Sequence, residues 1–503
     1  MTDVTAAASV LLTRGPGSAE VFIVGRAPTL RFMGGFHAFP GGKVHPTDAD
    51  LAGQTPGLTA QHVAAIRELF EETGVLLARG PDGACPPANL LPDLRREALA
   101  DRVTFSDVLA QLGLRLRPDD LTLAGALVTP AFAPVRFDTA FYVAELPPGQ
   151  EAEVWPGELT DGAWYSADEA LRRWTRGEVL LSPPTVSLLR AIRGRPVEEL
   201  PSRFGELVES LADGAIPPIW FSPAVQMIPL HTDGLPPSTH TSAWLVGTGP
   251  AYLIDPGPSD PGEQARLFEL LDARRDGAAL PSAVVLTHHH RDHVGAAAAC
   301  ARRYGIPVLA HALTARALEG KVEVQRELAD GERLDLGPAP DGAGRWHLEA
   351  VHTPGHARGH LAFVEPRYGL LFAGDMVSTL SSVLIAPSEG DLAVYLASLR
   401  RLQAYPLRLL LPAHGPPSAR PAFVLQECLD HRAQREAQLV EALAGPPRTV
   451  AELAVAVYRG LPAPMMKYAE MQVAAGLQKL EREGRAEAVA GPEGAAWRGR
   501  SPG

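Results

Sequence analysis

The sequence has few of the features that mark secreted, disulfide-bonded or membrane-spanning proteins. Only three cysteines, Cys85, Cys300 and Cys428, occur among 503 residues, so neither a disulfide framework nor a cysteine-based zinc knuckle can be built. No run of 18 apolar residues is present, which argues against a membrane-spanning helix. We interpret the three cysteines as small buried apolar residues in a protein of the reducing cytosol.

Positive charge is also in short supply. The formal net charge is −12, with −9 in residues 1–219, −5 in residues 220–430 and +2 in the tail from residue 431. Neutralisation of phosphates by Lys and Arg drives non-specific nucleic-acid binding, so the balance favours small-molecule substrates, although a local basic groove stays open. Residues 1–4 lack a basic region, so we expect no signal peptide and a cytoplasmic location.

What the chain does contain is a dense histidine cluster. Residues 287–293 read T-H-H-H-R-D-H and follow the apolar run 283–286, which is typical of a strand. A strand that ends there places four imidazoles and a carboxylate in one loop, and zinc, manganese and iron accept these ligands in hydrolytic sites. A solvated histidine-rich loop is the alternative for this stretch alone.

Three further ligand-type residues follow downstream. His356 lies in T-P-G-H, Asp375 in A-G-D and His414 in P-A-H-G, and small residues beside each allow the backbone to turn sharply. Each is preceded by or ends an apolar, strand-like segment: 348–351, 370–372 and 409–411. Another apolar segment, 251–254, ends in an acidic turn at Asp255.

This series resembles the metallo-β-lactamase superfamily, whose pattern is H-x-H-x-D-H followed by a distant His, Asp and His. The resemblance implies two zinc, manganese or iron ions, which lower the pKa of a shared water and so supply a nucleophile. It assigns His288, His290 and His356 to the first metal, Asp292, His293 and His414 to the second, and Asp375 to both. Asp292 also counts as catalytic, His289 is expected off the ligand face, and His360 has either a structural or a substrate-binding role.

A second motif, R-E-L-F-E-E-T-G-V, occupies residues 67–75. On a helix, Glu68, Glu71 and Glu72 fall at i, i+3 and i+4, so three mutually repelling carboxylates share one face. Magnesium or manganese would offset the repulsion, whereas an acidic solvated helix face is the alternative.

The motif resembles the second half of the Nudix box, and residues 35–43 match the preceding strand and glycine turn. The usual box has a Glu where Thr59 stands, and the longer spacer resembles the coenzyme A diphosphatase branch over residues 5–195. The resemblance implies that Arg67 orients the carboxylates, that the three glutamates bind the metal, and that Glu72 and Arg67 are catalytic. Arg26 and Arg31 are candidates for the coenzyme's phosphates, with surface salt bridges as the alternative.

The tail from His431 is helical in pattern. Thr449 and Glu452 form a capping box, Met466 to Glu483 is amphipathic, and a hairpin follows at 486–489 and 495–497. This arrangement resembles a winged helix of the β-lactamase-like protein 2 branch, which is associated with single-stranded RNA cleavage. Lys467, Lys479 and Arg482 lie among acidic residues, so we favour a packing or dimerisation module over a nucleic-acid reader.

The sequence therefore predicts a multidomain protein of α/β and α+β class. A Nudix α/β/α sandwich spans residues 1–205, a linker lies near 205–222, a metallo-β-lactamase αββα sandwich spans 222–430 and a winged helix spans 431–503. We expect a bifunctional metal-dependent hydrolase that cleaves a diphosphate linkage, as in coenzyme A, and a thioester or phosphodiester. The alternative is an endoribonuclease for single-stranded RNA with a ligand-sensing Nudix domain; no oligomeric state is assigned.

Overall fold

The apolar segment near the N-terminus forms the central strand of the first sheet. In the computed structural model, which describes residues 4–15, 20–212, 219–273, 280–491 and 494–500, β1 (Val4–Arg14) pairs with β2 and, in parallel, with β6. The sheet order is β3-β2-β1-β6-β5, with β4 beside β1 and β7 beside β2. The other strands are β2 (Glu20–Arg26), β3 (His37–Ala38), β4 (Gly41–Lys43), β5 (Thr122–Val128), β6 (Arg136–Glu145) and β7 (Leu159–Tyr165).

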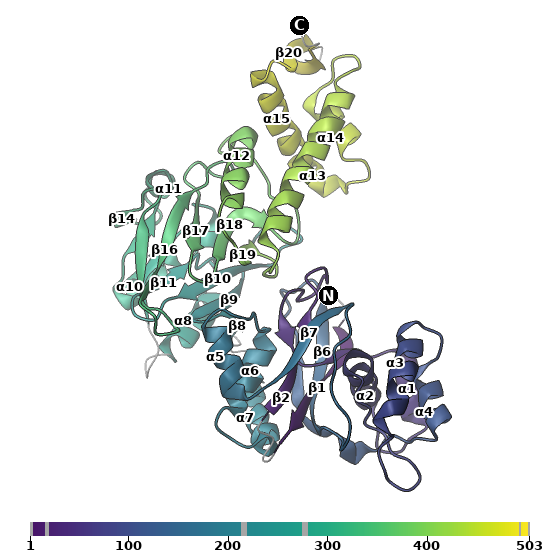
Figure 1. Cartoon of the computed structure of the whole chain (residues 1–503). Helices are drawn as coiled ribbons and strands as arrows, with labels where there is room; N and C mark the ends of the chain where they lie inside the picture. The colour runs from purple at the N-terminus through teal and green to yellow at the C-terminus, as the bar shows by residue number, and fades with distance from the viewer. Residues whose placement is uncertain (1–3, 16–19, 213–218, 274–279, 492–493, 501–503) are drawn as a thin grey trace. The chain divides into compact units, whose positions relative to one another are not determined.

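Alternating side chains on this sheet supply two cores. Val10 and Leu12 pack with α2 on one face, whereas Leu11 packs with α5, α6 and α7 on the other, because successive strand residues point to opposite faces. The predicted α/β/α sandwich is confirmed (Figure 1). The helices are α1 (Pro46–Gly53), α2 (Ala60–Thr73), α3 (Leu91–Leu99), α4 (Phe105–Leu112), α5 (Ala167–Thr175), α6 (Pro183–Ile192) and α7 (Leu200–Ala212).

Two further sheets form the layers of the second unit. The first has the order β14-β13-β12-β11-β10-β9 and the second β15-β16-β17-β18-β19. Trp244 of β10 and Phe372 of β18 meet between the sheets, with ring centroids 5.8 Å apart. The strands are β9 (Val225–His231), β10 (His240–Val246), β11 (Ala251–Ile254), β12 (Pro281–Val285), β13 (Val308–Ala310), β14 (Arg326–Glu327), β15 (Arg333–Pro338), β16 (Arg345–His352), β17 (Leu361–Glu365), β18 (Leu370–Ser378) and β19 (Leu409–His414).

Helices cover the outer faces of both sheets, as Figure 1 shows. Buried residues of α12 and α13 share a core with β17 and β18, and α10 packs on β12. The predicted αββα sandwich is therefore confirmed, with every strand expected before a ligand in place. The helices are α8 (Pro261–Asp272), α9 (Arg291–Val294), α10 (Ala297–Tyr304), α11 (Ala312–Ala317), α12 (Leu392–Gln403) and α13 (Pro421–Ala442).

The tail has the predicted winged-helix elements, which are α14 (Val450–Val457), α15 (Met466–Arg482), β20 (Ala486–Gly491) and β21 (Gly494–Gly499). Thr449 and Glu452 make the expected capping box at the start of α14. Gly484 follows α15 with a φ of 71°, where a side chain would be strained. Val473, Leu477 and Leu480 form the buried face of the predicted amphipathic helix α15, whereas Met471 is 40% exposed.

Two expectations, about the linker and the cysteines, need correction. The predicted linker begins inside α7, because buried Leu200 and Phe204 continue a helical pattern up to Ala212. Residues 213–218 lie outside the described residues, and β8 (Ile219–Ser222) follows them. Helix α13 runs unbroken across residues 430 and 431. Cys300 is buried as expected, whereas Cys85 and Cys428 are only partly buried.

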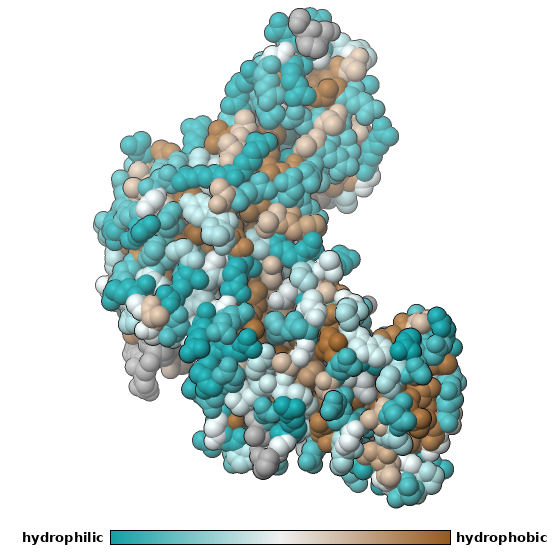
Figure 2. Space-filling view, viewed as in Figure 1, coloured by the Kyte–Doolittle hydropathy of each residue, from teal (hydrophilic) through white to brown (hydrophobic). Residues whose placement is uncertain are grey.

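The chain divides into two compact units, Met1–Pro223 and Ala224–Gly503. Among the described residues, no helix combines the length and apolar character needed to cross a membrane. Figure 2 shows hydrophilic residues over most of the visible face, with hydrophobic residues in smaller groups between them.

Candidate active sites

The histidine loop is held by a carboxylate from the neighbouring strand. β11 and β12 are parallel, so their carboxyl ends meet, and Asp255 lies one residue beyond β11 with a φ of 48°. Its carboxylate accepts hydrogen bonds from the backbone N–H and the hydroxyl of Thr287, at 2.8 and 2.6 Å. It also lies 2.8 Å from Nδ1 of His293, which fixes that ring. The sequence indicated the acidic turn but not this supporting role.

The structure brings the first four predicted ligands together. One ligand atom from each of His288, His290, His356 and Asp375 lies within 4.8 Å of the others. Nδ1 of His290 lies 2.8 Å from Nε2 of His288 and 2.9 Å from Nε2 of His356. Three imidazole nitrogens from two separate loops therefore converge on one point.

The other three ligands, Asp292, His293 and His414, form a second group beside it. Nε2 of His293 and Nε2 of His414 lie 3.4 and 3.3 Å from Oδ1 of Asp375, while its Oδ2 lies 3.5 Å from Nε2 of His356. Two atoms bound to one tetrahedral ion at about 2.1 Å are about 3.4 Å apart. The spacing thus fits shared cations, with Asp375 facing both groups.

Two neutral rings and two buried polar atoms without hydrogen-bond partners in this cluster also fit cation binding. Burial lowers the pKa of His356 to about 4 and holds the pKa of His288 well below its usual value, so both rings are neutral, as metal ligands must be. Burial alone would raise the pKa of Asp375, but His414 and His293 outweigh it and keep the pKa well below normal. Nε2 of His293 and Oδ1 of Asp375 are buried without hydrogen-bond partners among the described residues, which a cation would satisfy.

The other ring nitrogens of the ligands meet protein acceptors. Nδ1 of His356 lies 2.8 Å from the carbonyl oxygen of Leu384, and Nδ1 of His414 lies 3.0 Å from that of His240. Glu389 lies 3.1 Å from Nε2 of His290. Such contacts fix the tautomer and orientation of ligating imidazoles.

Glu389 was not identified from the sequence. Its second oxygen lies 2.9 Å from Nε2 of His289, and the hydrogen bonds from His289 and His290 lower the pKa of this carboxyl. His289 is not part of the two ligand groups that meet at Asp375, and its ring centroid lies 4.8 Å from that of His290.

His360 supports a ligand instead of facing a substrate. The ring is fully buried, Nδ1 lies 2.9 Å from the hydroxyl of Thr353, and Nε2 accepts a hydrogen bond from the backbone N–H of Asp375 at 3.1 Å. A Cβ on Gly374 would lie 2.6 Å from this ring nitrogen, so glycine is required there. The structural alternative therefore replaces the predicted substrate contact.

In the first unit, α2 carries the predicted carboxylate face. Nη1 of Arg67 donates to Glu68 and Glu71 at 2.9 Å each, and Oε2 of Glu72 accepts from the backbone N–H of Gly41 at 2.8 Å. Burial, followed by the charge of Glu68, raises the pKa of Glu72 to about 8. Burial also raises the pKa of Glu71 to about 7.

Burial disfavours the charged form of these carboxylates, and a bound divalent cation would offset that penalty, so the donor set fits magnesium or manganese. The glycine turn makes the crowding possible, because a Cβ on Gly42 would lie 2.3 Å from a carboxylate oxygen of Glu68.

Asp48 completes this site and was missed in the sequence. It is buried on α1. Its Oδ1 accepts a hydrogen bond from Nε of Arg67 and its Oδ2 accepts one from Nη2, at 2.9 Å each. Thr59, where the usual box has a Glu, instead caps α2 by accepting from the backbone N–H of His62. The acidic spacer was the available signal for Asp48, but its contact with Arg67 depends on how α1 folds back onto α2.

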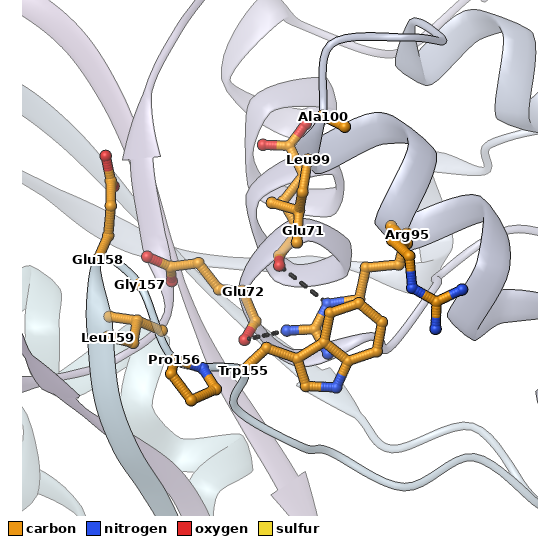
Figure 3. Close-up of a pocket in the computed structure, with 11 residues that line it drawn as sticks. Glu71, Glu72, Arg95, Leu99, Ala100, Trp155, Pro156, Gly157, Glu158 and Leu159 are labelled. Atoms are coloured by element: carbon orange, nitrogen blue, oxygen red, sulfur yellow. Dashed lines mark hydrogen bonds between the residues drawn. The ribbon is translucent and has the colours of Figure 1, made fainter.

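A cavity of about 370 Å³ adjoins Glu71 and Glu72 (Figure 3). Arg95 donates to the carbonyl oxygens of Glu71 and Glu72 and lies under the ring of Trp155, 4.2 Å from its centroid. Leu99, which is 51% exposed, adds an apolar wall.

The two predicted phosphate contacts differ in their surroundings. Arg26 is partly buried, its charge lowers the pKa of Glu72, and its Nε is buried without a hydrogen-bond partner in the described part of the chain. Arg31 is exposed. Arg26 is therefore near the carboxylates, while a substrate contact by Arg31 stays a prediction.

Comparison with known proteins agrees with both sites. Residues 237–414 match the family model of the metallo-beta-lactamase superfamily, residues 46–192 that of the NUDT19 Nudix domain, and residues 449–497 that of the beta-lactamase associated winged helix domain. A lactamase-like protein of Penicillium aethiopicum is 32% identical over 48% of this chain and 75% of its own length. The chain belongs to the metallo-β-lactamase superfamily.

Along the sequence, its metallo-β-lactamase domain is preceded by a Nudix domain and followed by a winged helix. The protein is a metallo-hydrolase. An atrochrysone carboxyl ACP thioesterase of Aspergillus terreus is 31% identical over 41% of the chain and 58% of its own length. A putative nudix hydrolase 7 of Caenorhabditis elegans is 32% identical over 36% of the chain and 57% of its own length. The chain thus spans less than two thirds of the last two relatives.

Proposed function

We propose that the chain is a bifunctional hydrolase with two independent sites. The metallo-β-lactamase domain cleaves a thioester, and the Nudix domain cleaves a diphosphate linkage of coenzyme A or a related nucleoside diphosphate derivative. The observation that carries the proposal is the presence of two donor sets in one chain: Asp375 with six further ligand-type residues, and three glutamates on α2, two of which bond to Arg67.

In the metallo-β-lactamase domain the chain's own residues organise the reaction. Asp375 faces both ligand groups, Asp255 fixes His293, and Asp292 lies beside His414 at 3.4 Å. Two cations held there would supply electrophilic polarisation and a water of lowered pKa. A thioester is favoured because a relative is named a thioesterase and because the domain is acidic, which disfavours non-specific binding of RNA.

In the Nudix domain, the guanidinium of Arg67 holds two carboxylates at fixed positions on one helix face. A divalent cation bound there would neutralise the charge of a diphosphate. The adjoining cavity supports a substrate with an apolar or aromatic arm, since Trp155 and Leu99 line it beside the carboxylates.

The thioester half is tested by assaying acyl-coenzyme A and acyl-carrier thioesters with the full chain and its His290→Ala variant. We expect thiol release that falls by at least about 10³-fold in the variant, because Nδ1 of His290 is the point where three ligands converge. Diphosphate cleavage by the same variant is the matched control and should be unchanged. Thiol release that survives His290→Ala would refute the assignment.

The diphosphate half is tested by Glu72→Gln, which keeps the side-chain volume but removes one charge from the cation-binding face. Cleavage of coenzyme A with magnesium or manganese should fall by orders of magnitude, while the variant's thioesterase activity stays at the wild-type level. Mass spectrometry should detect a phosphopantetheine product. Undiminished cleavage in Glu72→Gln would remove the Nudix site from the reaction.

A further inference from the structure

We propose that the winged helix positions the metal ligands of the metallo-β-lactamase site through the segment that joins β18 to α12. This rim segment comprises residues 379–391 and contains Glu389 as its positioning residue. The proposal rests on the metal site assigned above, and it gives the tail a task other than binding nucleic acid.

On its inner side, the rim segment contacts the imidazoles of two predicted ligands. Each contact is made at the ring nitrogen that does not face the ligand cluster. Glu389 lies 3.1 Å from Nε2 of His290, whose Nδ1 points to the other ligands. The carbonyl oxygen of Leu384 lies 2.8 Å from Nδ1 of His356, whose Nε2 points to the cluster. An imidazole held in this way keeps its second nitrogen as an oriented lone pair.

On its outer side, the same segment is held by the tail at two places. Nε2 of Gln472 on α15 donates to the carbonyl oxygen of Val383 at 2.8 Å, and Arg432 of α13 donates to the same oxygen. Val383 is the residue next to Leu384, so these two hydrogen bonds lie one residue from the contact with His356. Ala475 of α15 is buried in the same core as Val383, so side-chain packing also stabilises this contact.

The second contact between the tail and the rim segment lies at the other end of that segment. Arg482, at the end of α15, donates two hydrogen bonds to Asp391, at 2.5 and 3.0 Å. Asp391 follows Glu389 by two residues, and its carboxylate also caps α12 through the backbone N–H groups of Ala393 and Val394. Its own N–H donates to the carbonyl oxygen of Gly355, the residue before His356.

Two positively charged side chains of α15, which nucleic-acid binding would require, are already paired within the protein. Arg482 is bonded to Asp391, and Lys479 pairs with Glu436 and Glu483 at 2.6 and 2.7 Å. Two of the three basic side chains of α15 are therefore directed into its own domain and the rim segment, which favours positioning over phosphate binding.

The test measures zinc affinity of the full-length protein after removal of bound metal, by competition with a chromogenic chelator. Loss of an outer contact to a metal ligand typically weakens metal binding by about 10–100-fold. We expect Glu389→Gln to weaken zinc binding by an amount in this range. The double variant Gln472→Glu, Arg482→Ala should weaken zinc binding by about tenfold. Gln472→Glu keeps the side-chain volume but replaces a donor by an acceptor.

Arg485→Ala is the matched control, because Arg485 pairs with Glu436 and Glu483 and not with the rim segment. Its zinc affinity should equal that of the wild type. Circular dichroism and the diphosphatase activity of the Nudix domain verify folding of each variant.

Unchanged zinc affinity in the Gln472→Glu, Arg482→Ala protein would overturn the proposal, since the tail would then not act on the ligands. So would a variant that loses affinity for single-stranded RNA but keeps zinc, an outcome that identifies a nucleic-acid reader. A wild type that binds no zinc, manganese or iron would instead refute the metal site and with it the proposed thioesterase.

Discussion

Arg67 is a buried guanidinium whose partners are all acidic or carbonyl groups. Its side chain bonds to Asp48, Glu68, Glu71 and the carbonyl oxygen of Lys43. Burial lowers the pKa of Arg67, but the hydrogen bonds and charges of these carboxylates outweigh it and raise the pKa above its normal value. Because Asp48 contributes two of the hydrogen bonds, it is the residue that fixes the guanidinium plane.

Asp48→Ala should therefore destabilise the Nudix domain by about 3 kcal/mol, the typical effect of removing one partner of a buried ion pair. It should also lower diphosphatase turnover, because Arg67 could then rotate away from Glu68 and Glu71. Denaturant unfolding and coenzyme A cleavage measure the two effects. Asp50→Ala, on the same helix but exposed, is the control, and equal behaviour of the two variants would contradict the role of Asp48.

At the scale of elements, the hairpin between β17 and β18 depends on a buried acid. Glu365 is fully buried, and its oxygens accept the backbone N–H groups of Arg367 and Tyr368 at 2.8 Å each. Burial raises the pKa of Glu365 to about 7. The folded hairpin therefore binds a proton more tightly than the unfolded chain does.

A carboxyl with a raised folded pKa stabilises the fold at low pH and loses this contribution as the pH rises towards the folded pKa. Between about pH 4.5 and 7, the loss should be on the order of 3 kcal/mol. Glu365→Gln should flatten this part of the stability profile, measured as melting temperature against pH relative to wild type. The exposed Glu319→Gln serves as control, and a slope that persists in Glu365→Gln would assign the dependence to other groups.

At the scale of the whole molecule, charge distinguishes the proposed thioesterase from a ribonuclease. The net charge is −12, and Lys479 and Arg482 of α15 are engaged in ion pairs, while Lys467 lies over the ring of Tyr468. A protein that neutralises many phosphates loses affinity steeply between low and physiological salt.

We accordingly expect weak binding of single-stranded RNA, little change in that binding between 50 and 200 mM salt, and no RNA cleavage that depends on His290. Fluorescence anisotropy and a gel-based cleavage assay, run beside the thioesterase assay, provide the measurements. RNA cleavage abolished by His290→Ala, together with absent thioesterase activity, would reverse the choice of substrate.

The sequence by itself determined the features that depend on neighbouring residues. The helical face of Glu68, Glu71 and Glu72, the capping box at Thr449 and the strands before each ligand follow from local periodicity and turn residues, and the structure confirms them. The ligand motifs could be found for the same reason, since each lies at the end of an apolar segment.

Only the tertiary structure decided which distant side chains support these motifs. Asp48 meets Arg67 and Glu389 meets His290 across 19 and 99 residues, and His360 turned out to be fully buried. No periodicity encodes such contacts, because they exist only after separate elements have packed and buried charges have found partners. The same holds for Lys479 and Arg482 of α15, whose ion pairs with Glu436 and Asp391 depend on how the tail packs.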